Sequence, residues 1–392
     1  MIDPAVHEDV ACRVEGHWPR DLEGTFLRIG PHPLPGSPLM RWGSYPGLLH
    51  AVHLSSGAAW FRSTRMGVAD APSANVIVDS EEVLGFGERG PVWQVDLESL
   101  EAAARPITGG RAVTVPHAEV DSAGRLVLVA FDWPEKVLTA WTWESGAWRL
   151  RRSIDVPGRN YVHHAQVIGE ELVVGLHPLV RTPRGLGWDT RSTASTWVAA
   201  RLDCEDPPVV WEAAPCFVWH SGLVVRDPRE PRTLVLRAPV RPTPGLFPEE
   251  QVLDADVMPG VREWALDSES GRCRERQVTQ TPCDFPVPFG DLLVVGVAGS
   301  FRGGPDYTRC AGVALVDADG VETCRRHPAG TFGGEFRPVV TNEGAVLMGL
   351  ISGTEESQLL LLDPEDLAGE PIARVVIPAS VPAGLHAAWV PG

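Results

Sequence analysis

The feature that most limits the fold of this chain is a series of short apolar runs, each bounded by Gly, Asp, Pro or Asn. The runs lie at 126–131, 172–176, 234–236, 292–295, 313–316, 345–348 and 359–362. Each has the length of a β-strand. The 40 glycines and 36 prolines are spread throughout and leave little room for long helices. The sequence therefore predicts an all-β protein.

The runs are continuously apolar instead of alternating, which is typical of strands covered on both faces. Sheets that pack radially, as the blades of a β-propeller do, meet this condition. Seven blades would take roughly 56 residues each, enough for four strands with generous loops. No sequence repeat marks the blades. We expect residues 1–392 to form one domain, with the Pro-rich stretch 241–248 as a long surface loop.

Charge and composition exclude several classes of function. With 51 acidic and 34 basic residues, the formal net charge is −17, which repels nucleic acid and anionic membrane surfaces. No stretch reaches the roughly 18 apolar residues of an integral membrane segment, and the N-terminus does not resemble a signal peptide. The 7 cysteines form no CxxC pair. We expect a reduced, cytoplasmic protein without a thiolate zinc site.

Four of the 12 histidines adjoin apolar strand segments instead of lying in loops, namely His117, His163, His220 and His386. No two have the i, i+4 spacing of a helical metal motif. In a radial fold, however, one residue from each of several blades can converge on the axis. Imidazole binds iron, copper, nickel and zinc, so four histidines do not select among these metals. Spacing alone favours ordinary core or surface histidines over metal ligands.

The segments around these histidines resemble the carotenoid cleavage oxygenase family, which includes stilbene-cleaving oxygenases and the retinal-pigment isomerohydrolase. Residues 24–33, GTFLRIGPHP, and 47–52, GLLHAV, are similar to the family's GTYLRNGPNP and GMVHAV. The histidine segments follow in the same order: 115–121, VPHAEVD, is similar to TAHPKVD; 162–165, VHHA, to MHDF; 215–220, PCFVWH, to PCFVFH; and 381–391, VPAGLHAAWVP, to VPYGFHGNWVP.

The resemblance implies a seven-bladed propeller that holds Fe(II) through His117, His163, His220 and His386. Alignment with MHDF makes His163 the ligand and leaves His164 in the aspartate position. It also implies three carboxylates that accept hydrogen bonds from ligating imidazoles: Glu88, Asp284 and Glu335. Asp284 stands where the family has glutamate. Because aspartate is one methylene shorter, we expect its partner to shift or a water to bridge the gap.

The function implied is cleavage of a conjugated C=C bond of a polyene or aryl-alkene by O2, giving two carbonyl products. The partners would be an apolar small molecule and O2, and Trp219 is a candidate for lining the substrate cavity. Two alternatives remain open. The same scaffold can support a redox-neutral, iron-dependent isomerase or lyase, and a propeller can be a binding module without catalysis.

Overall fold

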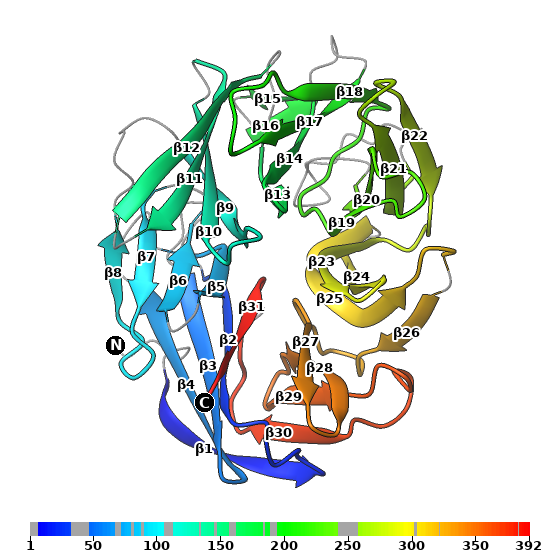
Figure 1. The fold of residues 1–392 in the computed structure, drawn as a ribbon. Helices are drawn as coiled ribbons and strands as arrows, with labels where there is room; N and C mark the ends of the chain where they lie inside the picture. The colour runs from blue at the N-terminus through cyan, green and yellow to red at the C-terminus, as the bar shows by residue number, and fades with distance from the viewer. Residues whose placement is uncertain are drawn as a thin grey trace. The chain divides into compact units, whose positions relative to one another are not determined.

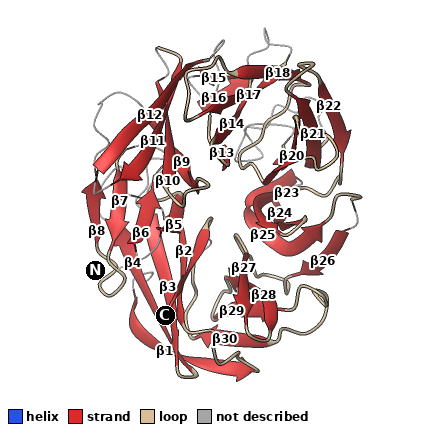
Figure 2. Cartoon of the chain, in the orientation of Figure 1, coloured by secondary structure: helices blue, strands red, loops and turns tan. Residues whose placement is uncertain are grey.

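The computed structural model describes the chain except for residues 1–6, 33–46, 67–71, 80–81, 88–89, 106–112, 133–134, 145–146, 157–161, 183–184, 189–193, 242–257, 302–303, 321 and 383. Within the described ranges the secondary structure consists of strands joined by turns and loops, without an α-helix (Figure 2). The all-β prediction is confirmed. Among these residues there is also no helix with the length and hydropathy needed to cross a membrane. Glu88 and most of the Pro-rich stretch lie outside the described residues.

The chain divides into two compact units, the first made of residues 1–105 and 287–392 and the second of residues 106–286. The single domain expected from the sequence stays a prediction.

The second unit is built from antiparallel sheets of four strands (Figure 1). The first sheet has the order β12–β11–β10–β9, with β9 Val113–Val120, β10 Leu126–Asp132, β11 Val137–Glu144 and β12 Ala147–Asp155. The second has the order β13–β14–β17–β18, with β13 Ala165–Ile168, β14 Glu171–Leu176, β17 Ser195–Arg201 and β18 Val209–Ala213. The third has the order β19–β20–β21–β22, with β19 Leu223–Arg226, β20 Thr233–Val240, β21 Gly260–Asp267 and β22 Cys273–Gln277. A two-stranded ribbon is formed by β15 Leu179–Thr182 and β16 Gly185–Trp188.

The first unit contains a nine-stranded sheet with the order β27–β28–β29–β30–β1–β4–β3–β2–β31. Its strands are β1 His7–Gly16, β2 Gly24–Pro31, β3 Gly47–Ser55, β4 Ala58–Met66, β27 Arg337–Thr341, β28 Gly344–Ile351, β29 Ser357–Leu362, β30 Ala373–Ile377 and β31 Ala387–Pro391. A four-stranded sheet holds β5 Asn75–Asp79, β6 Glu82–Phe86, β7 Val92–Val95 and β8 Ala102–Arg105. A further sheet of four starts at β23 Cys283–Phe289, where the chain returns to this unit, and continues with β24 Leu292–Phe301, β25 Gly304–Val316 and β26 Glu322–Arg326.

Strand β1 joins the two halves of the nine-stranded sheet. Its first part, up to Cys12, pairs with β4, and its last part, from Arg13 to Gly16, pairs with β30. The N-terminal strand thus connects segments from opposite ends of the sequence. No local pattern in the chain predicts this pairing.

All seven apolar runs fall within strands, and the strands that carry them are covered on both faces. In β10 and β14, for example, every run residue from Leu126 to Phe131 and from Leu172 to Leu176 is buried. One hydrophobic cluster, which includes Val127, Val129 and Val174, lies between the first and second sheets of the second unit. Another, around Trp197 and Trp264, lies between the second and third. Neighbouring sheets therefore pack face to face, as propeller blades do.

A buried histidine is part of this packing. His177, 3% exposed, makes edge-to-face contacts with Trp197 and Phe217 at ring-centroid distances of 6.0 and 5.5 Å. Burial lowers its pKa from 6.5 to about 4. The ring is therefore neutral in the folded protein at pH values where an exposed histidine would already be protonated.

We predict that His177 makes the protein sensitive to mild acid. A histidine with a depressed folded-state pKa contributes stability that is fully present above pH 6.5 and is lost as the pH falls toward 4. Between pH 7.5 and pH 5 the free energy of unfolding should fall by about 2 kcal/mol from this residue. Urea unfolding of wild type and H177Q at the two pH values measures the contribution, because glutamine does not titrate. An identical fall in both proteins would contradict it.

Candidate metal centre

Three of the four predicted ligands come together in the second unit. His117 lies within β9, His163 is two residues before the start of β13, and His220 lies in the loop before β19. All three are buried, with 5% to 6% of each residue exposed. Their ring centroids are 5.1 Å apart for His117 and His163, 4.9 Å for His117 and His220, and 5.1 Å for His163 and His220.

These distances fit three imidazoles around one cation. An imidazole nitrogen binds a first-row metal at about 2.1 Å, which puts the ring centroid roughly 3.3 Å from the ion; two rings at right angles then have centroids about 4.7 Å apart. The interplanar angles of 61° to 69° show three mutually tilted rings instead of a stack. The donor set and its geometry therefore suit a first-row transition metal.

The neighbouring His164 has a different environment. Its ring stacks on that of His117 at 4.4 Å and 26°. Its Nδ1 accepts a hydrogen bond from the backbone N–H of Ser221 at 3.0 Å, so the proton of the neutral ring is on Nε2. That Nε2 donates to Oε1 of Glu119 at 2.9 Å. Both nitrogens of His164 are thus occupied by protein groups.

The tautomer of His220 is set by Asp284. Nδ1 of His220 lies 2.7 Å from Oδ1 of Asp284, which also accepts the backbone N–H of Phe285 at 2.8 Å. Burial raises the pKa of Asp284, but the charge of Arg241 and the hydrogen bond from His220 outweigh burial and hold that pKa well below its usual value. An ionised carboxylate only accepts, so Nδ1 carries the proton and Nε2 keeps its lone pair for a metal. The contact is direct, and no bridging water is needed to span the shorter side chain.

Backbone geometry makes this direct contact possible. Phe285, the residue after Asp284, has φ of +53°, which is uncommon for a bulky residue and costs of order 1–3 kcal/mol. Its ring lies nearly parallel to that of His220, with centroids 5.3 Å apart and planes at 26°. The turn thus brings both the carboxylate and an aromatic face against one imidazole.

In the first unit, His386 shows the same pairing with the second predicted carboxylate. His386 directly precedes β31, and its Nδ1 lies 2.6 Å from Oε2 of Glu335. Burial raises the pKa of Glu335, while Arg337 and His386 lower it below its ordinary value in the net. In His386, as in His220, the proton on Nδ1 therefore leaves the lone pair on Nε2, the nitrogen that can bind a metal.

Trp219, the predicted cavity residue, is 5% exposed and packs among aromatic rings. Its ring meets that of His163 edge to face at 4.3 Å and 86°, and that of Phe217 at 5.0 Å and 83°. These contacts give it a packing role beside a candidate ligand. Contact with substrate stays a prediction.

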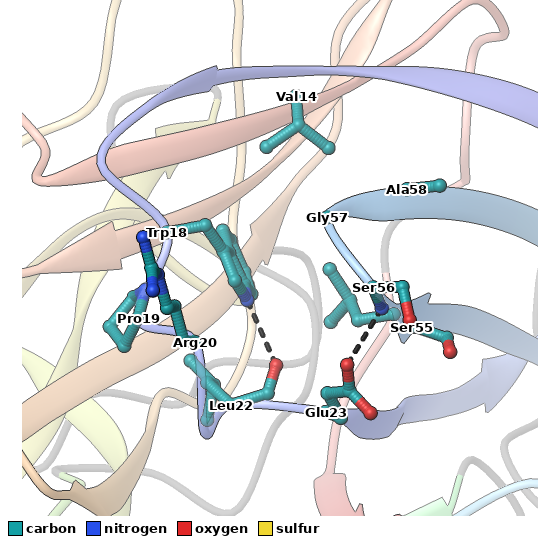
Figure 3. Close-up of a pocket in the computed structure, with 11 residues that line it drawn as sticks. Val14, Trp18, Pro19, Arg20, Leu22, Glu23, Ser55, Ser56, Gly57 and Ala58 are labelled. Carbon is teal, nitrogen blue, oxygen red and sulfur yellow. Dashed lines mark hydrogen bonds between the residues drawn. The ribbon is translucent and has the colours of Figure 1, made fainter.

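A hollow on the surface of the first unit lies apart from the predicted residues. It has a volume of about 410 Å³ and is lined by residues of the loop after β1 and of the β3–β4 turn (Figure 3). Trp18 Nε1 donates to the carbonyl of Leu22 at 2.9 Å, and the backbone N–H of Ser56 donates to Glu23 at 2.7 Å. None of its lining residues is a predicted site residue.

Sequence reasoning missed the two arginines that accompany the carboxylates. Arg241 forms a buried ion pair with Asp284, and Nε of Arg337 lies 2.7 Å from Oε1 of Glu335. Arg337 lies two residues after Glu335, so the sequence alone indicates a positive charge near that carboxylate. Arg241 is 43 positions away from Asp284 and carries no local signal.

The chain belongs to the family described as retinal pigment epithelial membrane protein, whose profile matches residues 62–391. A carotenoid cleavage oxygenase of Mycobacterium tuberculosis is 22% identical over 483 aligned positions, which cover 96% of this chain and 93% of the relative. The resemblance predicted from the motifs is confirmed, and the chain is an enzyme of the oxygenase type.

Solved structures share the fold. A variant of Synechocystis apocarotenoid oxygenase is 15% identical with a TM-score of 0.83, and a cobalt-substituted form of the Synechocystis enzyme is 17% identical with a TM-score of 0.81. Each comparison covers 98% of this chain and 96% of the other. The propeller-like β architecture expected from the sequence is thus confirmed.

The segment that carries His386 is held by close backbone contacts. A Cβ atom on Gly334 would lie 2.6 Å from the carbonyl oxygen of Gly384 and 2.7 Å from that of Leu385. Real Cβ atoms essentially never come this close to backbone oxygens. Because residue 334 is glycine, the segment that carries Glu335 can lie close to the backbone of Gly384 and Leu385, just before His386.

We predict that Gly334→Ala displaces this segment and lowers the free energy of unfolding by about 1–3 kcal/mol, the usual effect of overpacking. Val340→Ala, in the adjacent β27, is the control; its side chain is 83% exposed and should matter by less than about 0.5 kcal/mol. Denaturant unfolding of both variants checks the difference. Equal stability of G334A and wild type would show that the close approach is not a constraint.

Proposed function

We propose that this enzyme is a non-haem Fe(II) dioxygenase that cleaves a conjugated C=C bond of an apolar substrate with O2 to give two carbonyl products. The observation that carries the proposal is the group of three buried, mutually tilted imidazoles in the second unit. Oxygenase relatives and family membership support the reaction class.

The proposed ligands are His117, His163, His220 and His386. The carboxylate-bound Nδ1 of His220 and of His386 supports their assignment, because a proton on Nδ1 leaves the lone pair on Nε2, where a metal can bind. The occupied nitrogens of His164 support His163 as the ligand of the pair. We propose Asp284 and Glu335 as the carboxylates that orient the ligands. The corresponding role of Glu88 stays a prediction.

The scaffold we propose is a seven-bladed propeller. Five sheets have four strands each, and the nine-stranded sheet can be divided at β1 into two further blades, one with β27 to β30 and one with β2, β3, β4 and β31. One ligand from each of four blades is the arrangement that the radial fold favours.

The iron, when bound, would supply the one-electron chemistry that lets O2 react with a closed-shell alkene. The protein's own contribution is to orient the imidazoles and to exclude water. Burial of the three rings and their aromatic neighbours Trp219 and Phe285 provides the dry surroundings. No side-chain acid or base is needed for this step.

For the substrate we propose a polyene or aryl-alkene. The apocarotenoid and carotenoid relatives support an extended conjugated molecule. The redox-neutral isomerase or lyase differs in one observable, since it would not consume O2. A cytoplasmic location stays a prediction from the sequence.

We predict that His163→Ala reduces both iron content and turnover by at least about 100-fold, because loss of a ligand should exceed the 10–100-fold cost of losing an outer partner. Metal analysis of the purified protein measures the first effect. O2 uptake and product mass, with a panel of apocarotenoids, stilbenes and aryl-alkenes, measure the second.

His53→Ala is the matched control. His53 is exposed and contacts Thr25 at 3.1 Å in the first unit, so its removal should leave iron content and turnover unchanged. An H163A protein with full iron and activity would remove the basis of the assignment. Turnover of the wild type without O2 would instead favour the isomerase.

A further inference from the structure

The second oxygen of Asp284 is bound by a buried arginine. Oδ1 accepts from His220 and from the backbone of Phe285, while Oδ2 accepts from Nη2 of Arg241. The Arg241 and Asp284 side chains are only 3% and 2% exposed. Every orientation that this carboxylate could adopt by rotation would therefore break a charged hydrogen bond in a low-dielectric environment.

Arg241 is itself held by the segment that carries two of the candidate groups. Its backbone N–H donates to the carbonyl of Phe217 at 2.9 Å, three residues before His220. Its guanidinium lies over the ring of Trp219, 5.7 Å from the centroid. Trp219 in turn meets His163 edge to face. Arg241 thus contacts Asp284, which binds the His220 ring, and Trp219, which packs against the His163 ring.

The first unit repeats the pattern with other residues. Oε2 of Glu335 pairs with His386, and Oε1 lies 2.7 Å from Nε of Arg337. That Nε donates its hydrogen to the carbonyl of Ala387 at 2.7 Å, so Arg337 acts on Glu335 as a nearby charge. In each unit, one oxygen of a carboxylate thus lies against a histidine and its other oxygen lies near an arginine.

We propose that Arg241 is a positioning residue that fixes the orientation of Asp284, and thereby of the His220 ring, and that restrains His163 through Trp219. Its effect on a bound metal rests on the function proposed above. Its effect on the ring of His220 does not, and the two can be measured separately.

The chain provides a matched control for a buried arginine–carboxylate pair. Arg237, on β20 four residues before Arg241, has Nε 2.7 Å from Oε2 of Glu263, with side chains 11% and 13% exposed. The pair joins β20 to β21. Among the hydrogen bonds of the described residues, neither of its side chains contacts a candidate ligand. R237M should therefore lower stability much as R241M does, without the effects specific to His220.

The first experiment uses metal-free protein labelled with 15N-histidine. In wild type and R237M the Nδ1 proton of His220 should give a slowly exchanging NMR signal, because Asp284 is held against it. In R241M that signal should be lost to exchange. A retained signal in R241M overturns the proposal, whether or not the protein binds metal.

The second experiment titrates each protein with cobalt(II) alone and follows its absorption spectrum. R241M should bind cobalt about 10- to 100-fold more weakly than wild type, the usual cost of losing an outer partner, and R237M should stay within about twofold. Equal losses in both variants overturn the positioning role. A wild type that binds no cobalt overturns the proposed function, and the NMR result then decides the role of Arg241.

R241K provides a milder variant if R241M does not fold. Lysine keeps the charge but lacks the planar fork, so cobalt affinity should still fall by about threefold or more. Wild-type affinity and a retained His220 signal in R241K would overturn the proposal.

Discussion

The site depends on one interaction, the hydrogen bond from Nδ1 of an imidazole to a buried carboxylate. A neutral imidazole offers a metal its Nε2 lone pair only when Nδ1 carries the proton, and a carboxylate makes that tautomer the stable one. His220 and His386 both meet this condition, with Nδ1 to oxygen distances of 2.7 and 2.6 Å. The neighbouring His164 has the opposite tautomer, because a backbone N–H occupies its Nδ1.

Burying such carboxylates is costly, and much of the surrounding structure offsets that cost. An unpaired buried charge is strongly destabilising, whereas a charge with a well-placed partner and full hydrogen bonding is tolerated. Asp284 has three partners: an imidazole, a backbone N–H and a guanidinium. The backbone strain at Phe285 belongs to the same arrangement, since its positive φ lets the shorter aspartate reach His220 directly.

The sequence predicted the strands well because burial on both faces leaves a local mark. Every apolar run became a strand, including 359–362 within β29 and 345–348 within β28. Motif order predicted the four candidate histidines and the two carboxylates that lie against His220 and His386, since these residues lie in short recognisable segments. What local patterns could not indicate are contacts between distant segments: the pairing of β1 with both β4 and β30, and that of Arg241 with Asp284. Side-chain length alone also does not indicate the backbone turn at Phe285 that accompanies the direct contact of Asp284 with His220.

The two histidine–carboxylate pairs are fixed by different means. In the second unit, His220 is held by the charged pair Asp284 and Arg241, whose side chains are at most 3% exposed. The low dielectric there makes each contact strong. In the first unit, Arg337 is 31% exposed, so solvent screens its attraction to Glu335. Backbone hydrogen bonds supply the order there instead: Ile29 exchanges them with Leu385 and His386 at 2.8 and 3.0 Å, and Arg28 binds the carbonyl of Pro382 at 2.8 Å. His386 is therefore positioned mainly by backbone hydrogen bonds next to β31, whereas His220, which lies in a loop, is oriented by charged side chains.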